Sequence, residues 1–251
     1  MNEVQTRLLR MYEEVRESLD RHGIPFYGFF GTALGAVRHG GFIPWDDDID
    51  LVVLREDLPA VAAALREDLD PGRYYYHEPS ADDHPHVMDM SGGEESLRDR
   101  TALFIDIFPL CEYPDGAFRK AVEDAAIWGD NLAIYALDRV RPEAVHKGLR
   151  WTHRFFSKLA DMAAGPGCGK ATVRSTQFKE YVFPKECFGN PVRRPFEGTD
   201  MPLPEKWDAM LTKLYGDYMT PPPEPERKGA GGFPCSVLLD YRRDKKRKEK
   251  I

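Results

Sequence analysis

Apolar residues near the start of the chain recur every three or four positions, which predicts an amphipathic helix over residues 2–22. Gly23 ends this pattern. Residues 24–30 form a short aromatic run that predicts a strand, and Gly31-Thr32 leads from it into a short helix over 33–38. The residues that define the first helix are Val4, Leu8, Leu9, Met11, Tyr12, Val15 and Leu19.

The pattern continues as short apolar runs between polar segments. A second strand is predicted over 49–54, followed by a helix over 56–69 that begins with acidic residues. Further strand-like runs lie around 73–77, 87–90 and 102–110.

The second half of the chain has a different pattern. Apolar residues at helical spacing predict helix from about 117 to 164, and Gly165-Pro166-Gly167 ends it. Residues 181–230 are rich in proline and predict irregular structure, apart from an amphipathic helix at about 204–214. We therefore expect an α/β fold of the α+β kind, with a mixed β-sheet flanked by helices and a mostly helical C-terminal half.

This pattern divides the chain into three segments. We expect a catalytic core over residues 1–115, a helical region packed on it over 116–230, and a basic tail over 231–251.

Composition restricts the class of protein. The chain has 251 residues, of which 42% are hydrophobic and 31% charged, which excludes disordered, collagenous and coiled-coil proteins. No run approaches the roughly 18 apolar residues of a membrane span, and the charged N-terminus is not a signal peptide. Four widely spaced cysteines predict reduced thiols in a cytosolic protein, without a zinc site or a disulfide framework. They are Cys111, Cys168, Cys187 and Cys235.

Charge is unevenly distributed. The formal net charge is −7, but residues 241–251 hold seven Lys/Arg and two acids (+5), so the other 240 residues carry −12. An acidic body excludes a protein that mainly binds nucleic acid through its phosphates. The basic tail is interpreted as a disordered terminus or a surface without a specific role; the alternative is a weak electrostatic tether to an anionic membrane.

The most informative segment is the acidic run Asp46-Asp47-Asp48-Ile49-Asp50. Its carboxylates repel one another unless they are solvated or neutralised by cations. The period of two of a strand places Asp48 and Asp50 on the same face, about 6–7 Å apart at Cα. That spacing suits oxygen donors sharing hard divalent ions such as Mg²⁺.

A further acid, Asp106, lies within the strand-forming run 103–108. Burying a lone carboxylate in such a run is costly, and a metal shared with Asp48 and Asp50 would remove the cost. The alternative for an acidic run is a solvated loop or a helix cap. The acidic run leads directly into one strand, and Asp106 lies inside another. Together they favour a metal site over a loop or a cap.

The string from Gly31 to Asp50, GTALGAVRHGGFIPWDDDID, resembles the LicD family almost residue for residue. This family includes bacterial phosphocholine transferases of cell-surface glycans, is related to the fukutin-type transferases and has the nucleotidyltransferase fold. The later segments 104–110, 194–198 and 214–223 also resemble its motifs. One difference is that the histidine expected soon after Pro223 is absent from this chain.

The resemblance implies transfer of phosphocholine from CDP-choline to a sugar hydroxyl of a cell-surface glycan or its lipid-linked precursor, with release of CMP. Displacement at phosphorus requires a divalent metal, Mg²⁺ or Mn²⁺, to neutralise developing charge. Asp48, Asp50 and Asp106 would hold the metal, and Asp106 is the candidate base toward the acceptor hydroxyl.

Three residues are candidates for binding the phosphates. Gly31 would let the backbone approach closely, Thr32 opens a helix with free N–H groups, and Arg38 would clamp a phosphate. The alternatives are that Gly31 only makes a turn and that Arg38 pairs with Asp46 or Asp47.

Aromatic residues of the family motifs are candidates for the choline ammonium group. The candidates are Trp45, Tyr215, Tyr218 and Phe196, and a core role is favoured for each of them. Trp45 and Tyr215 are kept as candidate substrate-binding residues, and Glu197 is expected to face the site. The pair His84-Pro85-His86 is interpreted as a surface loop, and His39 as a helper in phosphate binding.

Two other activities remain open. The first is a transferase of the same type that uses CDP-ribitol or CDP-glycerol as its donor. The second is a nucleotidyltransferase that acts on a small molecule. The expected partners are CDP-choline or a related CDP-alcohol and a glycan or lipid-linked glycan acceptor, without nucleic acid. The expected location is the cytoplasm, with the inner face of the membrane as the alternative.

Overall fold

A computed structural model describes the chain between residues 1 and 249. The residues outside the description are 79–83, 115, 140–142, 166–168, 174–180, 228, 230, 231, 234, 235, 250 and 251. Cys168 and Cys235 are among them, while Cys111 and Cys187 are buried thiols. Among the described residues, no helix is long and apolar enough to cross a membrane.

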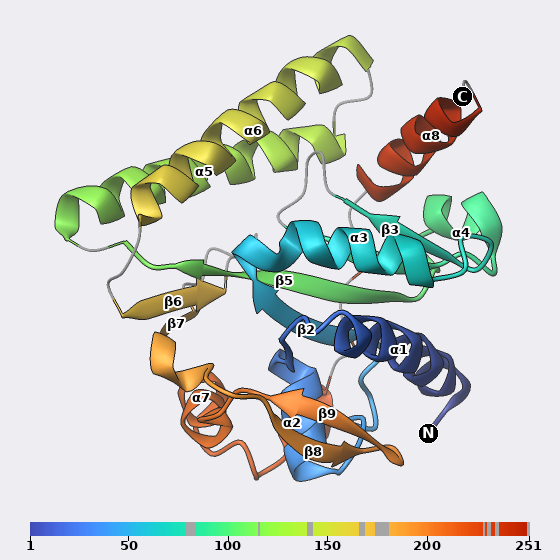
Figure 1. Ribbon diagram of the computed structural model, residues 1–251, viewed down its shortest axis with the longest axis vertical. Helices are drawn as coiled ribbons and strands as arrows, with labels where there is room; N and C mark the ends of the chain where they lie inside the picture. Colours follow the sequence, from blue (N-terminus) through green and yellow to red (C-terminus); the bar gives the residue numbers. More distant parts are fainter. Residues whose placement is uncertain are drawn as a thin grey trace.

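A mixed β-sheet forms the centre of the molecule (Figure 1). Five strands run in the order β1-β2-β5-β4-β3; β2 and β5 are parallel and the other neighbours antiparallel. β6 pairs with the end of β5, and β7 pairs with β6. The strands are β1 (Phe26–Gly28), β2 (Ile49–Leu54), β3 (Tyr74–His77), β4 (His86–Asp89), β5 (Phe104–Glu112), β6 (Lys170–Val173) and β7 (Tyr181–Pro184).

Helices surround this sheet, which confirms the predicted α/β class with a mixed sheet. The predicted helical stretch 117–164 is a hairpin of two long helices, and Gly165 (φ 61°) ends it. The helices are α1 (Glu3–Arg21), α2 (Phe30–Arg38), α3 (Leu58–Asp68), α4 (Gly93–Arg98), α5 (Ala117–Arg139), α6 (Glu143–Ala164), α7 (Trp207–Tyr215) and α8 (Ser236–Lys248). Short 3₁₀ turns are η1 (Arg55–Asp57), η2 (Lys185–Cys187) and η3 (Glu224–Glu226).

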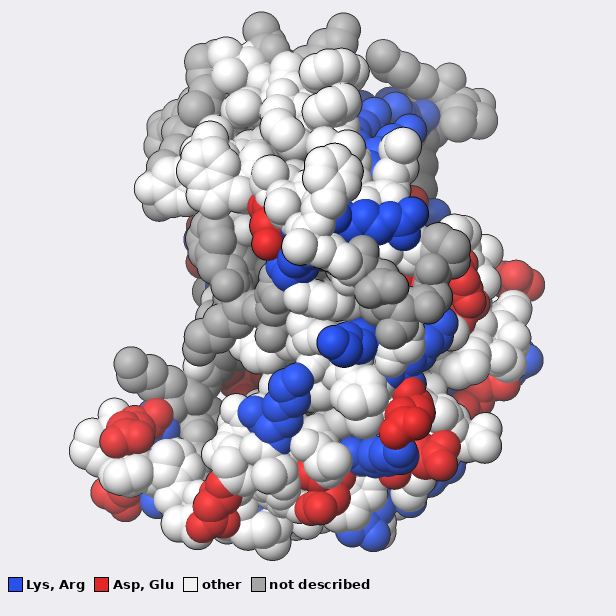
Figure 2. Space-filling view, turned by 90° about the vertical axis from the view of Figure 1, so that its left-hand side faces the viewer, with Lys and Arg blue, Asp and Glu red and all other residues white. Residues whose placement is uncertain are grey.

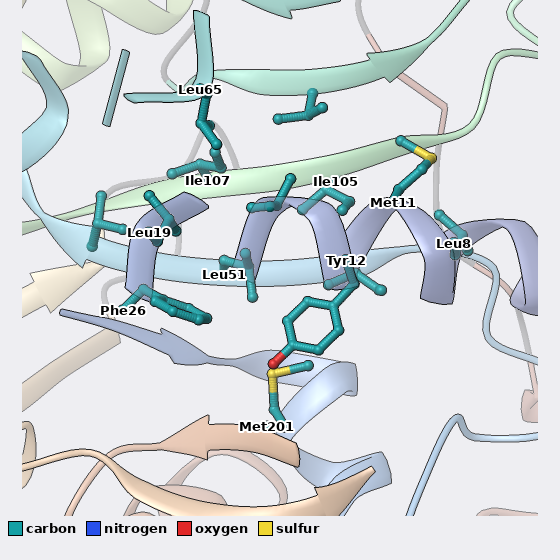
Figure 3. Packing of buried hydrophobic residues seen from close by; sticks show 14 of the residues in the cluster. Leu8, Met11, Tyr12, Leu19, Phe26, Leu51, Leu65, Ile105, Ile107 and Met201 are labelled. Atoms are coloured by element: carbon teal, nitrogen blue, oxygen red, sulfur yellow. The ribbon is translucent and has the colours of Figure 1, made fainter. Parts of the chain in front are cut away.

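Helix α1 packs its apolar face across β2 and β5, as Figure 3 shows. Asn2 and Gln5 cap its first turn: the Gln5 amide donates to Asn2 Oδ1 at 2.8 Å, and the Asn2 amide donates to Gln5 Oε1 at 3.2 Å. The Gln5 side chain also donates to the carbonyl oxygens of Ile43 and Asp46, both at 3.1 Å. The start of α1 therefore holds the loop that carries the acidic run.

The segment 181–230 was wrongly predicted to be irregular outside one helix. It contains β7 and a separate two-stranded hairpin of β8 (Val192–Phe196) and β9 (Thr199–Leu203). Its turn is Glu197-Gly198, with φ values of 50° and 86°. The strand pattern of β8 and β9 was not recognised because each strand contains a proline, Pro195 or Pro202. Proline is unfavourable inside a larger sheet but tolerated in an isolated two-stranded ribbon.

The basic tail is a helix, so its interpretation as a disordered terminus was wrong. Val237 and Asp240 of α8 are buried, and the Tyr241 ring packs edge-on to Tyr75 at 5.2 Å. Arg242 Nε lies 2.7 Å from Glu94 Oε1. The helix contributes to the apolar cluster with Met88 and Phe104, and it thereby covers part of the sheet.

Two helical glycines provide a matched test of packing. A Cβ on Gly35 of α2 would lie 2.4 Å from the Gly41 carbonyl oxygen, whereas one on Gly148 of α6 would meet no atom within 4 Å. We expect Gly35→Ala to lower the free energy of unfolding by about 1–3 kcal/mol through overpacking. Gly148→Ala should leave it unchanged or raise it by up to about 1 kcal/mol.

Urea unfolding of both variants measures the difference. Equal effects of the two substitutions would contradict the close packing of the 39–42 loop on α2.

Candidate active site

A row of polar side chains crosses four neighbouring strands on one face of the sheet. Asp50 of β2 is in register with Asp106 of β5, Asp106 with His86 of β4, and His86 with His77 of β3. Directly paired residues project to the same face of a sheet. Asp48 stands two residues before Asp50, so all three predicted acids meet at the parallel pair β2–β5.

This row lies on the face opposite α1 and α3. The alternate residues Leu51, Ile105 and Val87 belong to the cluster packed under those two helices. On the side of the row, Val52 and Phe108 belong to one apolar cluster and Met88 and Phe104 to another. The charged side chains are therefore confined between two apolar clusters, where desolvation is strong.

The carboxylate oxygens of Asp48, Asp50 and Asp106 lie within 4.8 Å of one another. Each of the three residues is at most 8% exposed. Burial, reinforced by the charges of Asp46 and Asp106, raises the pKa of Asp48 to about 8. Burial and the charge of Asp48 also raise the pKa of Asp50 well above its usual range. Buried oxygen donors that resist ionisation when alone fit a divalent cation, which would stabilise the ionised forms.

Asp46 also belongs to this site, because it contacts one of the three acids. Its carboxyl group hydrogen-bonds with that of Asp48, and burial together with the charge of Asp47 raises its pKa to about 6. A Cβ on Gly31 would lie 2.7 Å from Asp46 Oδ2. Gly31 therefore leaves room for this carboxylate at the start of α2. This role goes beyond making the turn into the helix.

Asp106 differs from the other acids because it has imidazole partners. Nε2 of His84 and Nε2 of His86 each lie 3.1 Å from Asp106 Oδ1. Burial disfavours the ionised carboxylate, but the two histidines outweigh it, and the pKa of Asp106 falls below its usual range. The interpretation of His84-Pro85-His86 as a surface loop was wrong: His86 is 1% exposed and lies in β4.

Sequence reasoning missed these histidines because an H-P-H string is typical of a turn. Two features of the sequence could have identified these histidines. Asp106 lies inside an apolar strand, where a buried carboxylate needs partners. His86 and Met88 alternate with Val87, as expected of a strand.

The structure gives Thr32 and Arg38 contacts within the protein. Thr32 is buried, and its hydroxyl accepts a hydrogen bond from the Asp50 amide at 2.9 Å, which fixes the start of β2. Arg38 Nη1 donates to the Tyr218 carbonyl oxygen at 2.9 Å, and Arg38 Nε lies 3.5 Å from His39 Nδ1. Within the described residues Arg38 makes no ion pair, so the alternative of pairing with Asp46 or Asp47 is excluded.

Tyr215 lies at the end of α7, near the acids. Burial of the hydroxyl and the charges of Asp50 and Asp46 raise its pKa above the usual range. Tyr215 also influences the pKa of Arg38, which burial lowers. Tyr215 is therefore close to both the acidic cluster and Arg38.

Other candidates are engaged with the protein itself. Glu197 Oε1 accepts from the Phe42 amide at 3.0 Å and so holds the loop before Trp45. The Arg227 guanidinium lies 4.8 Å above the centre of the Trp45 ring. Phe196 is fully buried, as favoured. Substrate contacts of Glu197 and Trp45 remain predictions.

An aromatic wall beside the acids was not anticipated. Phe30 packs edge-on to Phe108 at 5.4 Å and to Tyr181 at 5.0 Å, and the His84 ring lies 4.2 Å from Phe108. Phe30 and Tyr181 are only half-buried. Phe30 also has φ 39°, a conformation that costs a non-glycine residue about 1–3 kcal/mol and is typical of functional sites. From the sequence, Phe30 and Phe108 were predicted to lie in strands, and Tyr181 in an irregular segment.

Comparison with known proteins gives the site a context. Residues 23–128 match the family model described as LicD/FKTN/FKRP, nucleotidyltransferase domain. A Haemophilus influenzae protein named lipopolysaccharide cholinephosphotransferase LicD is 24% identical over 91% of this chain and 94% of its own length. An uncharacterised Rickettsia prowazekii protein is 42% identical over 50 residues, 20% of this chain and 19% of that protein.

A solved structure, terminal uridylyl transferase 4 from Trypanosoma brucei with bound GTP, is 16% identical in a match that covers 61% of this chain and 49% of that chain. The TM-score of this match is 0.25.

The raised pKa values predict a pH dependence of stability. Between pH 6.5 and 8 the unfolded chain has ionised carboxylates, whereas folded Asp48, whose pKa is about 8, retains its proton over much of this window. The raised pKa of Asp50 acts in the same direction. The folded state then binds more protons, so the free energy of unfolding should fall as pH rises, by up to about 1.4 kcal/mol per pH unit for each such carboxyl. Mg²⁺ or Mn²⁺ should reduce this fall because it binds the ionised form.

Urea unfolding in EDTA and in divalent metal across this pH window measures the effect. Asp48→Asn should flatten the profile in EDTA, and Glu56→Gln, an exposed acid just after β2, should not. Stability that rises with pH in EDTA would contradict the repulsion at this site.

Proposed function

The chain belongs to the LicD family, and on that premise we propose that it transfers phosphocholine from CDP-choline to a sugar hydroxyl. The acceptor is a cell-surface glycan or its lipid-linked precursor, and CMP is released. One observation carries the proposal: Asp48, Asp50 and Asp106 meet, buried, at the parallel pair β2–β5. The name and nearly full-length match of the Haemophilus influenzae relative support the choice of group transferred.

The chemistry proposed for the three acids is divalent metal binding. Mg²⁺ or Mn²⁺ suits a set of carboxylate oxygens and would neutralise charge on the diphosphate of the donor. Asp48, Asp50 and Asp106 would hold it, and Asp46 would share the proton or charge of Asp48. The lowered pKa of Asp106 makes it a weak base, so we propose metal binding as its main role.

The donor phosphates would lie between the acids and α2. Arg38 lies near Tyr215, and its Nη2 has no protein partner among the described residues. A guanidinium with free N–H groups is suited to a phosphate. The Gly31 and Thr32 amides in the first turn of α2 have no partner inside the helix and would also face an anion.

The aromatic wall supports a choline-containing donor over a polyol. Phe30, Tyr181 and Tyr215 offer partly exposed rings beside the acidic cluster. A quaternary ammonium group is attracted to aromatic faces and to carboxylates, whereas ribitol and glycerol need hydrogen-bonding side chains. We place the reaction in the cytoplasm, where CDP-activated donors would be supplied.

A donor panel tests the proposed function. With Mg²⁺ or Mn²⁺ the protein should release CMP from CDP-choline faster than from CDP-ribitol or CDP-glycerol, and EDTA should abolish release. Asp50→Asn should lower the rate by at least about 100-fold, because the metal would lose a ligand while the fold remains. Glu56→Gln serves as the charge-matched control with an unchanged rate.

Chromatographic detection of CMP measures all arms. Release of CMP from a polyol donor only, or transfer of CMP itself from CDP-choline with release of phosphocholine, would contradict phosphocholine transfer.

A further inference from the structure

The histidines beside Asp106 have no task in the proposed reaction. We propose that His84, His86 and Asp106 bind a second metal ion of the transition series, Zn²⁺ or Fe²⁺ in type, with Asp106 shared between this ion and the carboxylate site. Nε2 of each histidine and a carboxylate oxygen of Asp106 lie within 4.8 Å of one another. This inference is independent of the group that the enzyme transfers.

The spacing of the donor atoms fits one ion. Both imidazole Nε2 atoms lie 3.1 Å from the same oxygen, Asp106 Oδ1. Metal–ligand bonds of about 2.0–2.2 Å separate neighbouring ligand atoms of one first-row ion by about 3.0–3.4 Å. Imidazole nitrogen favours transition metals over Mg²⁺, so the ion would differ from the one held by carboxylates alone.

The hydrogen-bonded row behind His86 supports a metal on its Nε2. Three contacts of 3.1 Å follow one another: His86 Nε2 to Asp106 Oδ1, His86 Nδ1 to His77 Nδ1, and His77 Nε2 to Asp240 Oδ2. Each needs one proton, but two neutral imidazoles carry only two N–H groups. Without a metal the row therefore needs an additional proton in a site where His77 and Asp240 are at most 1% exposed.

A metal on His86 Nε2 removes this requirement, since that nitrogen then offers its lone pair. His86 Nδ1–H donates to His77 Nδ1, His77 Nε2–H donates to Asp240, and both rings are neutral; the third proton leaves to solvent. Arg243 Nη1 lies 2.8 Å from Asp240 Oδ1 and provides a positive charge beside this carboxylate. A carboxylate that orients a metal-binding histidine is a common arrangement in proteins, and here a second imidazole extends it.

Cobalt binding tests the second site. Metal-free protein in saturating Mg²⁺ should bind one equivalent of Co²⁺, with visible absorption that Zn²⁺ displaces. His86→Gln should abolish this absorption, and Asp240→Asn should weaken Co²⁺ binding by about 10–100-fold through the orientation of His77 and His86. His153→Gln is the matched control, because His153 is a buried histidine whose Nδ1 lies 2.6 Å from Asp130, on the α5–α6 hairpin.

His84→Gln, at the less buried ligand, replaces His86→Gln if thermal unfolding shows that the latter is unfolded. Unchanged Co²⁺ binding in the folded histidine variant would overturn the second site. Failure of CMP release with Co²⁺ binding intact would count against the proposed function alone.

A second observation concerns the α5–α6 hairpin, which projects from the sheet in Figure 1. Its surface carries exposed aromatic and apolar residues, and the upper part of Figure 2, formed by this hairpin, presents mainly uncharged side chains. Trp151 is 68% exposed and Trp128 63%. The full set is Phe118, Trp128, Leu132, Tyr135, Val145, Trp151, Phe155 and Met162.

The basic residues on this surface indicate which kind of partner it binds. Arg150, Arg154 and Lys158 recur every four residues on α6, beside Trp151 and Phe155, and none of the three pairs with an acid among the described residues. Aromatic residues next to a row of cations are typical of helices that lie in the interface of an anionic membrane. We infer that the hairpin docks on an anionic lipid surface, with basic α8 as a further attraction.

Vesicle sedimentation tests this inference. Wild-type protein should sediment with phosphatidylglycerol-containing vesicles and less with pure phosphatidylcholine. Two double variants should each reduce the bound fraction at least several-fold: Trp151→Ala with Phe155→Ala, and Arg154→Glu with Lys158→Glu. The control Arg10→Glu, at an exposed position of α1, should not reduce it. Full binding by both hairpin variants, or a wild-type dimer in solution that these substitutions dissolve, would overturn the membrane assignment.

Discussion

The repulsion among three buried carboxylates is the constraint on which the rest of the structure depends. Parallel pairing of β2 with β5 sets Asp50 beside Asp106, and Asp48 enters from the loop before β2. This arrangement is unfavourable at neutral pH without a compensating cation. Contacts from several elements maintain this arrangement of carboxylates. Gln5 of α1 binds the loop carbonyls, Thr32 holds the Asp50 amide, and Gly31 leaves space for Asp46.

The polar row continues beyond the acids and gives the C-terminal helix a place in the site. His86 and His77 extend the row across β4 and β3, and Asp240 of α8 ends it. A helix that begins at residue 236 thus reaches a site formed mainly before residue 110. Because apolar clusters flank the row on both sides, its hydrogen bonds are shielded from water and stronger than exposed ones.

Sequence reasoning located what depends on local pattern and missed what depends on distant partners. The helix over 2–22 and the strands around Asp50 and Asp106 follow from periodicity, and an acid inside an apolar strand indicates a partner. Periodicity does not tell which partner: His77 and Asp240 are 163 residues apart, and His86 lies in a string typical of a turn. Proline hid the β8–β9 hairpin, and the high density of charge hid the folded state of α8.

The most direct measurement of the central claim is the position of Mn²⁺, from its anomalous scattering, in crystals grown with the ion. We predict an anomalous peak within about 2.0–2.3 Å of carboxylate oxygens from Asp48, Asp50 and Asp106, a distance set by metal–oxygen bonds. Crystals saturated with Mn²⁺ in which these carboxyls bind no ion and hydrogen-bond only to one another would contradict the account.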